Sequence, residues 1–142
     1  MTNTKNSTSI TRNLVPDNKR TKIVADLFGI DFPQRIEPLV FAVAEEMGHE
    51  YRGGLWKFFA LSNGGFYMSP EFDGLFTVSC ENGFSGSMSA DALGIAACIY
   101  AYSYISFTDN QALAELCARH FHLLRDYALD HPEERGIMAA ID

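Results

Sequence analysis

Residues 89–107 read SADALGIAACIYAYSYISF and are apolar on nearly every side when placed on a helix. A helix that is apolar all round is buried all round, so we expect residues 90–106 to form a central helix that lies against a sheet. Ser89 is suited to cap this helix, and Asp91 lies in the first turn, where the helix dipole favours a carboxylate. The stretch therefore predicts a domain built around one buried helix.

A sheet is predicted immediately before this helix, because short apolar or alternating segments are separated by turn residues. The candidate strands are residues 55–61, 66–69, 75–80 and 84–88, and the turns between them contain Asn63-Gly64, Asp73-Gly74 and Asn82-Gly83. Asn-Gly and Asp-Gly pairs tolerate the positive φ of tight hairpins, so even spacing predicts an antiparallel meander of three to four strands. Pro70 cannot donate to a ladder and is expected at a strand end or an edge.

Further helices are predicted on both sides of the meander. Apolar residues at three- and four-residue steps indicate a helix over about 34–50, preceded by a short helical turn within 20–29. A second amphipathic pattern begins at Thr108-Asp109 and ends near Asp130, because Pro132 disfavours helical geometry at His131. Residues 132–140 fit a last short helix. The fold class is therefore α+β: an N-terminal helix, an antiparallel three- to four-stranded meander, then a buried central helix and two further C-terminal helices.

The length of 142 residues allows one compact domain. Residues 1–17 are rich in Ser, Thr and Asn and are expected to be a flexible polar arm, which leaves residues 18–142 as the single domain. The first 30 residues hold five basic and two acidic side chains, whereas the remainder holds six basic and sixteen acidic ones. An acidic body does not bind nucleic acid by neutralising phosphates, so we expect no stable nucleic-acid binding.

The polar N-terminal stretch lacks the apolar segment of a secretory signal, and no window approaches 18 uninterrupted apolar residues. Three cysteines, an odd number without a CxxC pair, fit a reducing compartment rather than a disulfide framework. These features predict a cytoplasmic protein that does not associate with a membrane.

Four histidines and three cysteines leave a Cys/His hydrolase open on inventory alone. Cys98 and Cys117 fall on core faces, where a thiol is usually inert, so Cys80 is the one candidate nucleophile. Cys117 and His120 lie three apart on a helix, but two ligands do not make a metal site, and a core histidine with one hydrogen-bond partner is the better interpretation of His120. We therefore expect no enzyme, no catalytic residues, no metal and no cofactor.

Two surface features are candidates for partner binding. The loop Ser62–Gly65 has no phosphate-binding glycine motif around it and is interpreted as a hairpin turn. Acidic residues gather near the C-terminus, at Asp126, Asp130, Glu133 and Glu134. Like charges one helical turn apart are tolerated on a solvated surface, so this cluster is either a plain solvated face or a patch that faces a partner.

Three stretches resemble the KlcA/ArdB antirestriction family of plasmids and other mobile elements. They are Gly53–Pro70 (GGLWKFFALSNGGFYMSP), Met88–Ala97 (MSADALGIAA) and Leu124–Asp142 (LRDYALDHPEERGIMAAID), and Leu14–Asp17 is similar to the segment that opens the family's domain. Together they cover most of the chain beyond the first dozen residues, in the same order. The resemblance implies an antirestriction protein that relieves type I restriction of incoming unmodified DNA, and it implies no catalytic residue.

Two mechanisms compete for such an acidic protein. A compact domain of this length is roughly 37 Å across, a span over which duplex DNA presents about 22 phosphates. Sixteen scattered carboxylates cannot imitate that row on one face. We therefore hypothesise an inhibitor that binds the host type I restriction complex or a factor regulating it, through Asn63, Gly64, Asp126, Asp130, Glu133 and Glu134. Partial DNA mimicry by a short acidic patch and a hydrolase dependent on Cys80 remain the alternatives.

Overall fold

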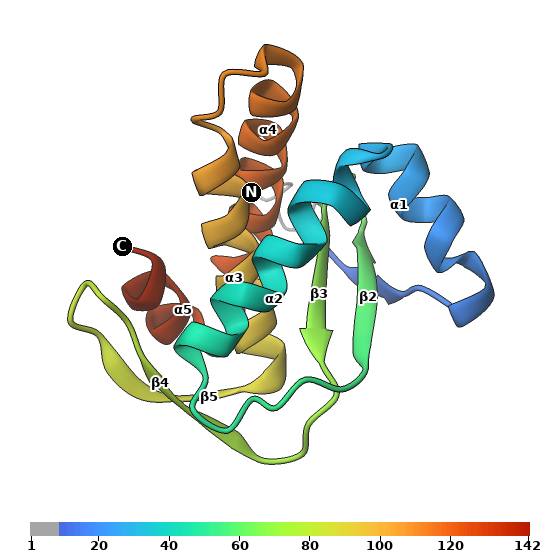
Figure 1. Ribbon diagram of the computed structural model, residues 1–142. Coiled ribbons are helices and arrows are strands. Elements are labelled where there is room, and N and C mark those ends of the chain that lie inside the picture. Colours follow the sequence, from blue (N-terminus) through green and yellow to red (C-terminus); the bar gives the residue numbers. More distant parts are fainter. Residues whose placement is uncertain (1–8) are drawn as a thin grey trace, which may run out of the picture.

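The computed structural model describes residues 9–142. In chain order its elements are β1 (Arg12–Leu14), α1 (Arg20–Phe28), α2 (Glu37–Met47), β2 (Trp56–Leu61), β3 (Phe66–Pro70), β4 (Leu75–Ser79), β5 (Ser85–Ser89), α3 (Ala90–Ile105), α4 (Gln111–Ala128) and α5 (Glu134–Ile141). A 3-10 turn, Asp17–Lys19, precedes α1, and a π-helical turn, Phe32–Ile36, leads into α2. The predicted α+β class is confirmed, and Figure 1 shows α3 at the centre with the other helices and both sheets around it.

The strands form two antiparallel sheets rather than one continuous meander. One sheet has the order β1-β2-β3, and β4 and β5 form a separate two-stranded sheet (Figure 1). The β2–β3 and β4–β5 hairpins close at Gly64 and Gly83, whose φ values of 93° and 98° match the expected turns. The chain leaves the first sheet at Pro70, the last residue of β3, which has no N–H to continue a ladder. The second hairpin is instead joined to the end of α2 by a bridge between Gly48 and Val78.

The first strand lies within the segment expected as an arm. Arg12 pairs with Leu61 and Leu14 with Phe59, and the Val15 N–H donates to the Phe58 carbonyl at 2.8 Å. This pairing covers an edge of β2 that would otherwise present free backbone groups. The arm expected over residues 1–17 therefore contains a strand of the sheet, while residues 1–8 lie outside the described part of the chain.

The helices match the sequence pattern closely at some ends and differ at others. The Ser89 side chain caps α3 by accepting from the Ala92 N–H at 3.1 Å, as predicted. The cap of α4 is Asn110, which accepts from the Leu113 N–H, rather than the expected Thr108-Asp109. The helix expected over 34–50 stops at Met47, and its first turn is the π-helical segment. Within residues 9–142 no helix combines the length and the apolar character needed to cross a bilayer.

The backbones of α3 and β3 are in direct contact at Gly94. A Cβ atom built on Gly94 would lie 2.3 Å from the Met68 carbonyl oxygen and 2.5 Å from the Ser69 Cα. About two turns further along α3, the buried Tyr102 hydroxyl donates to the Phe66 carbonyl at 2.9 Å. The helix is thus fixed on the strand by shape at one point and by a buried hydrogen bond at another.

We expect Gly94→Ala to lower the free energy of unfolding by about 3 kcal/mol, since the added methyl group meets backbone atoms that cannot move aside. Gly136→Ala in α5 is the matched control. Its Cβ would only touch Met88 Cε at 3.8 Å, and alanine is the better helix former, so we expect a gain of about 0.5–1 kcal/mol. Urea unfolding of the two variants checks this, and equal stabilities would contradict the close approach.

His120 lies in the core, as predicted, but its environment is aromatic rather than polar. Its ring is 4.5 Å from the Phe28 ring and 5.7 Å from the Tyr102 ring, measured between centroids. Its Nδ1 is buried and has no hydrogen-bond partner within residues 9–142, unlike the single partner we expected. Burial, with a smaller contribution from the charge of Arg119, lowers the pKa of His120 to about 4.

Because the folded-state pKa lies below the usual 6.5, His120 becomes protonated in the unfolded chain at a higher pH than in the folded chain. Its effect on stability is therefore absent at pH 7 and grows as the pH falls from about 6.5 to about 4. We expect His120 to lower the unfolding free energy of wild type by about 2 to 3 kcal/mol between pH 7 and pH 4.5, and His120→Leu to lack this decrease. Denaturant titrations at both pH values measure it, and parallel pH curves for wild type and variant would refute a neutral buried imidazole.

Candidate partner-binding surface

The β2–β3 turn is attached to α4 by Asn63. Its side-chain amide donates to the Leu123 carbonyl at 2.9 Å, and its Oδ1 accepts from the Gly65 N–H at 2.9 Å. Gly65 itself packs on the Leu123 side chain, where an added Cβ would come within 3.1 Å. Both polar ends of Asn63 are thereby used within the fold, whereas the neighbouring Gly64 is exposed at the tip of the turn.

The four acidic residues predicted as one cluster divide into two kinds. Asp126 in α4 and Asp130 just after it are exposed. Glu133 is half-buried, and its carboxylate accepts from both the N–H and the hydroxyl of Ser89 at the start of α3. Glu134, also half-buried, begins α5. The structure thus presents two of these carboxylates fully to solvent and uses Glu133 to hold the start of α3.

A second group of polar side chains converges on Asp91. Tyr67 donates to Asp91 Oδ1 at 2.6 Å, Arg12 forms an ion pair with the same oxygen, and His131 bonds Oδ2 at 2.8 Å. The His131 Nδ1 accepts from the Glu133 N–H at 3.0 Å, so Nε2 carries the proton that is donated to Asp91. Four separate parts of the chain, β1, β3, α3 and the loop before α5, therefore meet at one carboxylate.

Electrostatics keep the Asp91 carboxyl ionised and the Tyr67 hydroxyl protonated near neutral pH. Burial acts to raise the pKa of Asp91, but the hydrogen bonds from His131 and Tyr67 and the charge of Arg12 outweigh it and hold the pKa below its ordinary value. Burial and the adjacent carboxylate raise the pKa of Tyr67 well above that of free tyrosine. Both nitrogens of His131 and both oxygens of Asp91 are engaged in hydrogen bonds, so this cluster ties distant elements of the fold together.

The cysteines are poorly suited to nucleophilic catalysis. Burial raises the pKa of Cys80, raises that of Cys98 to about 12, and raises that of Cys117 to about 11. Only the thiolate is a good nucleophile, so all three side chains are held in their unreactive form near neutral pH. Within residues 9–142, no three side chains of the His, Cys, Asp or Glu type are grouped so that they could hold a metal ion.

Known proteins show which family has this arrangement. A family model described as antirestriction protein matches residues 49–142. The antirestriction protein KlcA of Escherichia coli is 35% identical over 146 aligned positions that cover 100% of both chains. This chain belongs to the KlcA/ArdB antirestriction family. The resemblance noted in the sequence is confirmed.

Other KlcA/ArdB-like proteins extend the comparison. The uncharacterized protein YfjX of Escherichia coli K12 is 42% identical over 134 residues, which cover 90% of this chain and 85% of YfjX. A solved structure from the KlcA/ArdB family has a TM-score of 0.86 and 37% identity, and the match covers 94% of this chain and 95% of that one. The KlcA and ArdB proteins are described there as having a novel fold and antirestriction activity against type I DNA restriction systems in vivo but not in vitro.

Sequence reasoning on this KlcA/ArdB-like chain missed the Asp91 cluster. Asp91 was assigned only to the helix dipole, and Arg12, Tyr67 and His131 were not selected at all. The four residues lie on segments up to 119 positions apart, and no local spacing links them. The one available signal is Pro132, which disfavours helical geometry at His131 and so places His131 in the loop between α4 and α5.

We expect Asp91→Asn to cost about 1–3 kcal/mol of unfolding free energy at pH 7, because an amide cannot accept from Arg12, Tyr67 and His131 together. Since the pKa of Asp91 is lowered by folding, its stabilisation is present above about pH 4 and is lost as the pH falls through the lower folded value. The difference in unfolding free energy between wild type and variant should therefore shrink as the pH falls below about 4 in urea titrations. Asp17→Asn, at a side chain 99% exposed, is the control and should match wild type at pH 7.

Proposed function

We propose that this protein relieves type I restriction of incoming unmodified DNA by binding a host protein in the cytoplasm. The bound protein is the type I restriction complex or a factor that regulates it. Membership of the KlcA/ArdB antirestriction family supports the biological role. Three free cysteines are consistent with a reducing compartment.

The hydrogen bond from Asn63 to Leu123 is the observation that supports one binding surface. It holds the exposed Gly64 turn against α4, and Asp126 lies one helical turn beyond Leu123. Asp130 follows at the end of the same helix. A turn and an acidic helix end that are 60 residues apart in sequence thereby form a continuous surface, which is the kind of composite patch that a protein partner contacts.

The activity described for KlcA and ArdB in vivo but not in vitro bears on the target. A protein that blocked the restriction enzyme by occupying its DNA-binding channel would also act on the purified enzyme. Dependence on the living cell favours a target that a purified reaction lacks. Among the two targets proposed, this argument favours the factor that regulates the restriction complex.

Mimicry of DNA and catalysis are less well supported by the same geometry. Duplex DNA carries one charge per ~1.7 Å, whereas the surface described here offers Asp126 and Asp130 one helical turn apart, with Glu133 turned onto α3. A hydrolase dependent on Cys80 needs a thiolate, and burial raises the pKa of that thiol. Binding to a protein needs neither a row of charges nor a reactive group.

The test is transfer of unmodified DNA into restricting and non-restricting hosts, with and without the protein. Wild type should raise transfer in the restricting host only. We expect Asp126→Asn/Asp130→Asn to reduce this relief about tenfold, because both carboxylates are exposed and their loss alters the surface rather than the fold. Circular dichroism should show unchanged secondary structure in the variant.

Two controls separate the alternatives. Cys80→Ala should retain full relief, and loss of relief in this variant, with the double aspartate variant active, would establish the hydrolase instead. Asp73→Asn/Asp109→Asn neutralises two exposed carboxylates elsewhere and should also retain relief. Displacement of this protein from the restriction complex by duplex DNA would favour mimicry over a separate protein-binding surface.

A further inference from the structure

The helix predicted to be buried on every side is uncovered on one of them. Tyr100 and Tyr104 of α3 expose 41% and 65% of their surface, and Phe107 just beyond it exposes 84%. These residues follow one another at four- and three-residue steps, so they share one face of the helix. Leu129, at the end of α4, is 46% exposed beside them. The expectation of complete burial is therefore wrong for this face.

The exposed aromatic residues line a groove between α3, α4 and α5. The groove has a volume of about 710 Å³, and its apolar lining also includes Ile99, Phe121, Met138 and Ile141. We refer to it as the aromatic groove. A monomeric protein rarely leaves several large apolar side chains exposed around one concave surface without a binding role. The groove is therefore a candidate docking site that opens beside the acidic end of α4.

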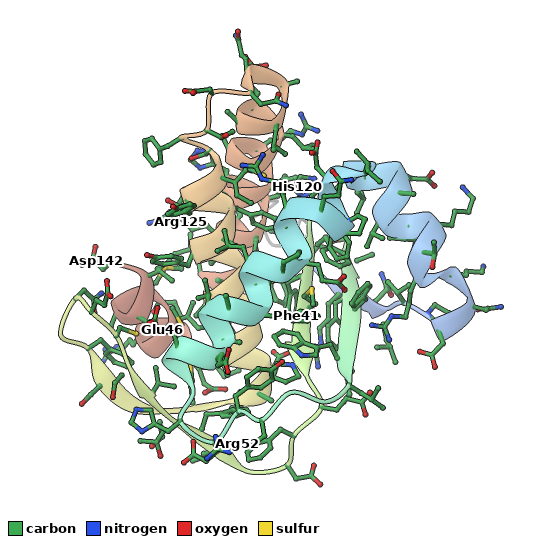
Figure 2. The ribbon with its side chains drawn as sticks, viewed as in Figure 1. Phe41, Glu46, Arg52, His120, Arg125 and Asp142 are labelled. Atoms are coloured by element: carbon green, nitrogen blue, oxygen red, sulfur yellow. The ribbon has the colours of Figure 1, made fainter. Side chains whose placement is uncertain are left out.

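Carboxylates dominate the charged rim of this surface. Glu134 and Asp142 line the aromatic groove, and Glu46 and Glu81 line a hollow of about 440 Å³ that shares Tyr100, Ile141 and Asp142 with it. Arg125 is the one cationic side chain among the residues that line the two. Figure 2 shows Arg125 of α4, Glu46 of α2 and the C-terminal residue Asp142 on the side of the molecule where the C-terminus lies.

We propose that the aromatic groove binds a basic amphipathic segment of the partner protein, an inference that rests on the function proposed above. Apolar side chains of the segment pack on Tyr104 and Phe107, while its Lys and Arg side chains pair with the carboxylates of the rim. A cation can also lie over a tyrosine ring, which adds to the preference for a basic segment. Burial of the aromatic surface supplies affinity, and the charge pattern supplies selectivity.

The charge pattern distinguishes this occupant from two others. Nucleic acid would bring phosphates to the groove and the adjoining hollow, whose linings together hold four carboxylate side chains and one cation, and the excess negative charge would repel it. A second copy of this chain carries a formal net charge of -7 and would bring mostly like charges to the same rim. A basic segment is attracted to these carboxylates instead of being repelled by them, and its apolar face covers the aromatic side chains.

A synthetic peptide tests the groove directly. The probe has about 14 residues, with Leu at helical i, i+3, i+4 and i+7 spacing and Lys elsewhere, and a second peptide replaces each Lys by Glu. We expect the Lys peptide to bind full-length wild type at least about tenfold more tightly than the Glu peptide. Tyr104→Ala/Phe107→Ala should weaken the Lys peptide about tenfold or more, as expected for buried aromatic anchors.

Leu55→Ala/Leu75→Ala is the matched control, since these side chains are 73% and 61% exposed and lie away from the groove. It should bind the Lys peptide as wild type does. Equal affinity of the groove variant and wild type would overturn the proposal, and so would equal binding of the two peptides. A dimer of wild type that the groove variant loses in native mass spectrometry would assign the groove to a second copy, which also overturns it.

The transfer assay separates this inference from the proposed function. If wild type relieves restriction and the groove variant relieves it equally well, the proposed function stands and the groove proposal fails. If wild type gives no relief in the restricting host, the proposed function fails, and peptide binding alone decides whether the groove takes a basic segment. Loss of relief in the groove variant, with the leucine control active, supports both.

Discussion

The contact between the backbone of α3 at Gly94 and the backbone of β3 is the constraint on which the rest of the fold depends. Only a residue without a side chain allows this distance, since a Cβ would lie 2.3 Å from a carbonyl oxygen. Once the helix is seated there, its small residues bring the remaining elements close, and α2, α4 and α5 pack around it. A helix of larger residues would stand away from the sheet and lose this packing density.

The seated helix also explains why some charged residues serve the fold. The start of α3 presents Ser89 and Asp91 toward β1, β3 and the loop before α5, and each finds partners there. Glu133 resembles an exposed acidic residue in the sequence. It accepts hydrogen bonds from Ser89, the cap of α3, because the chain turns back at Pro132. The unpaired backbone groups at the start of a helix need hydrogen-bond partners, and here the Glu133 carboxylate serves this need instead of facing a partner protein.

The surface that remains offers several features suited to contacts with a partner. The polar groups of the Asp91 cluster are paired with one another, and the thiols are held protonated by burial. The exposed features are the Gly64 turn, which is held against α4 at Leu123, the acidic end of α4, and the aromatic groove, which α4 lines with Phe121, Arg125 and Leu129. The partner-binding role proposed for this chain is consistent with such a surface.

The sequence by itself determined the α+β class, the extents of α3 and α5 to within a few residues, the cap at Ser89, the hairpins at Gly64 and Gly83, and the family. These depend on local periodicity, turn chemistry and short motifs, all of which are written along the chain. The split of the meander into two sheets, the strand within the expected arm, the Asp91 cluster and the uncovered face of α3 were decided only by tertiary structure. Each of them depends on which distant segments meet, and hydrophobic period alone shows that a face is apolar without showing whether this chain or another covers it.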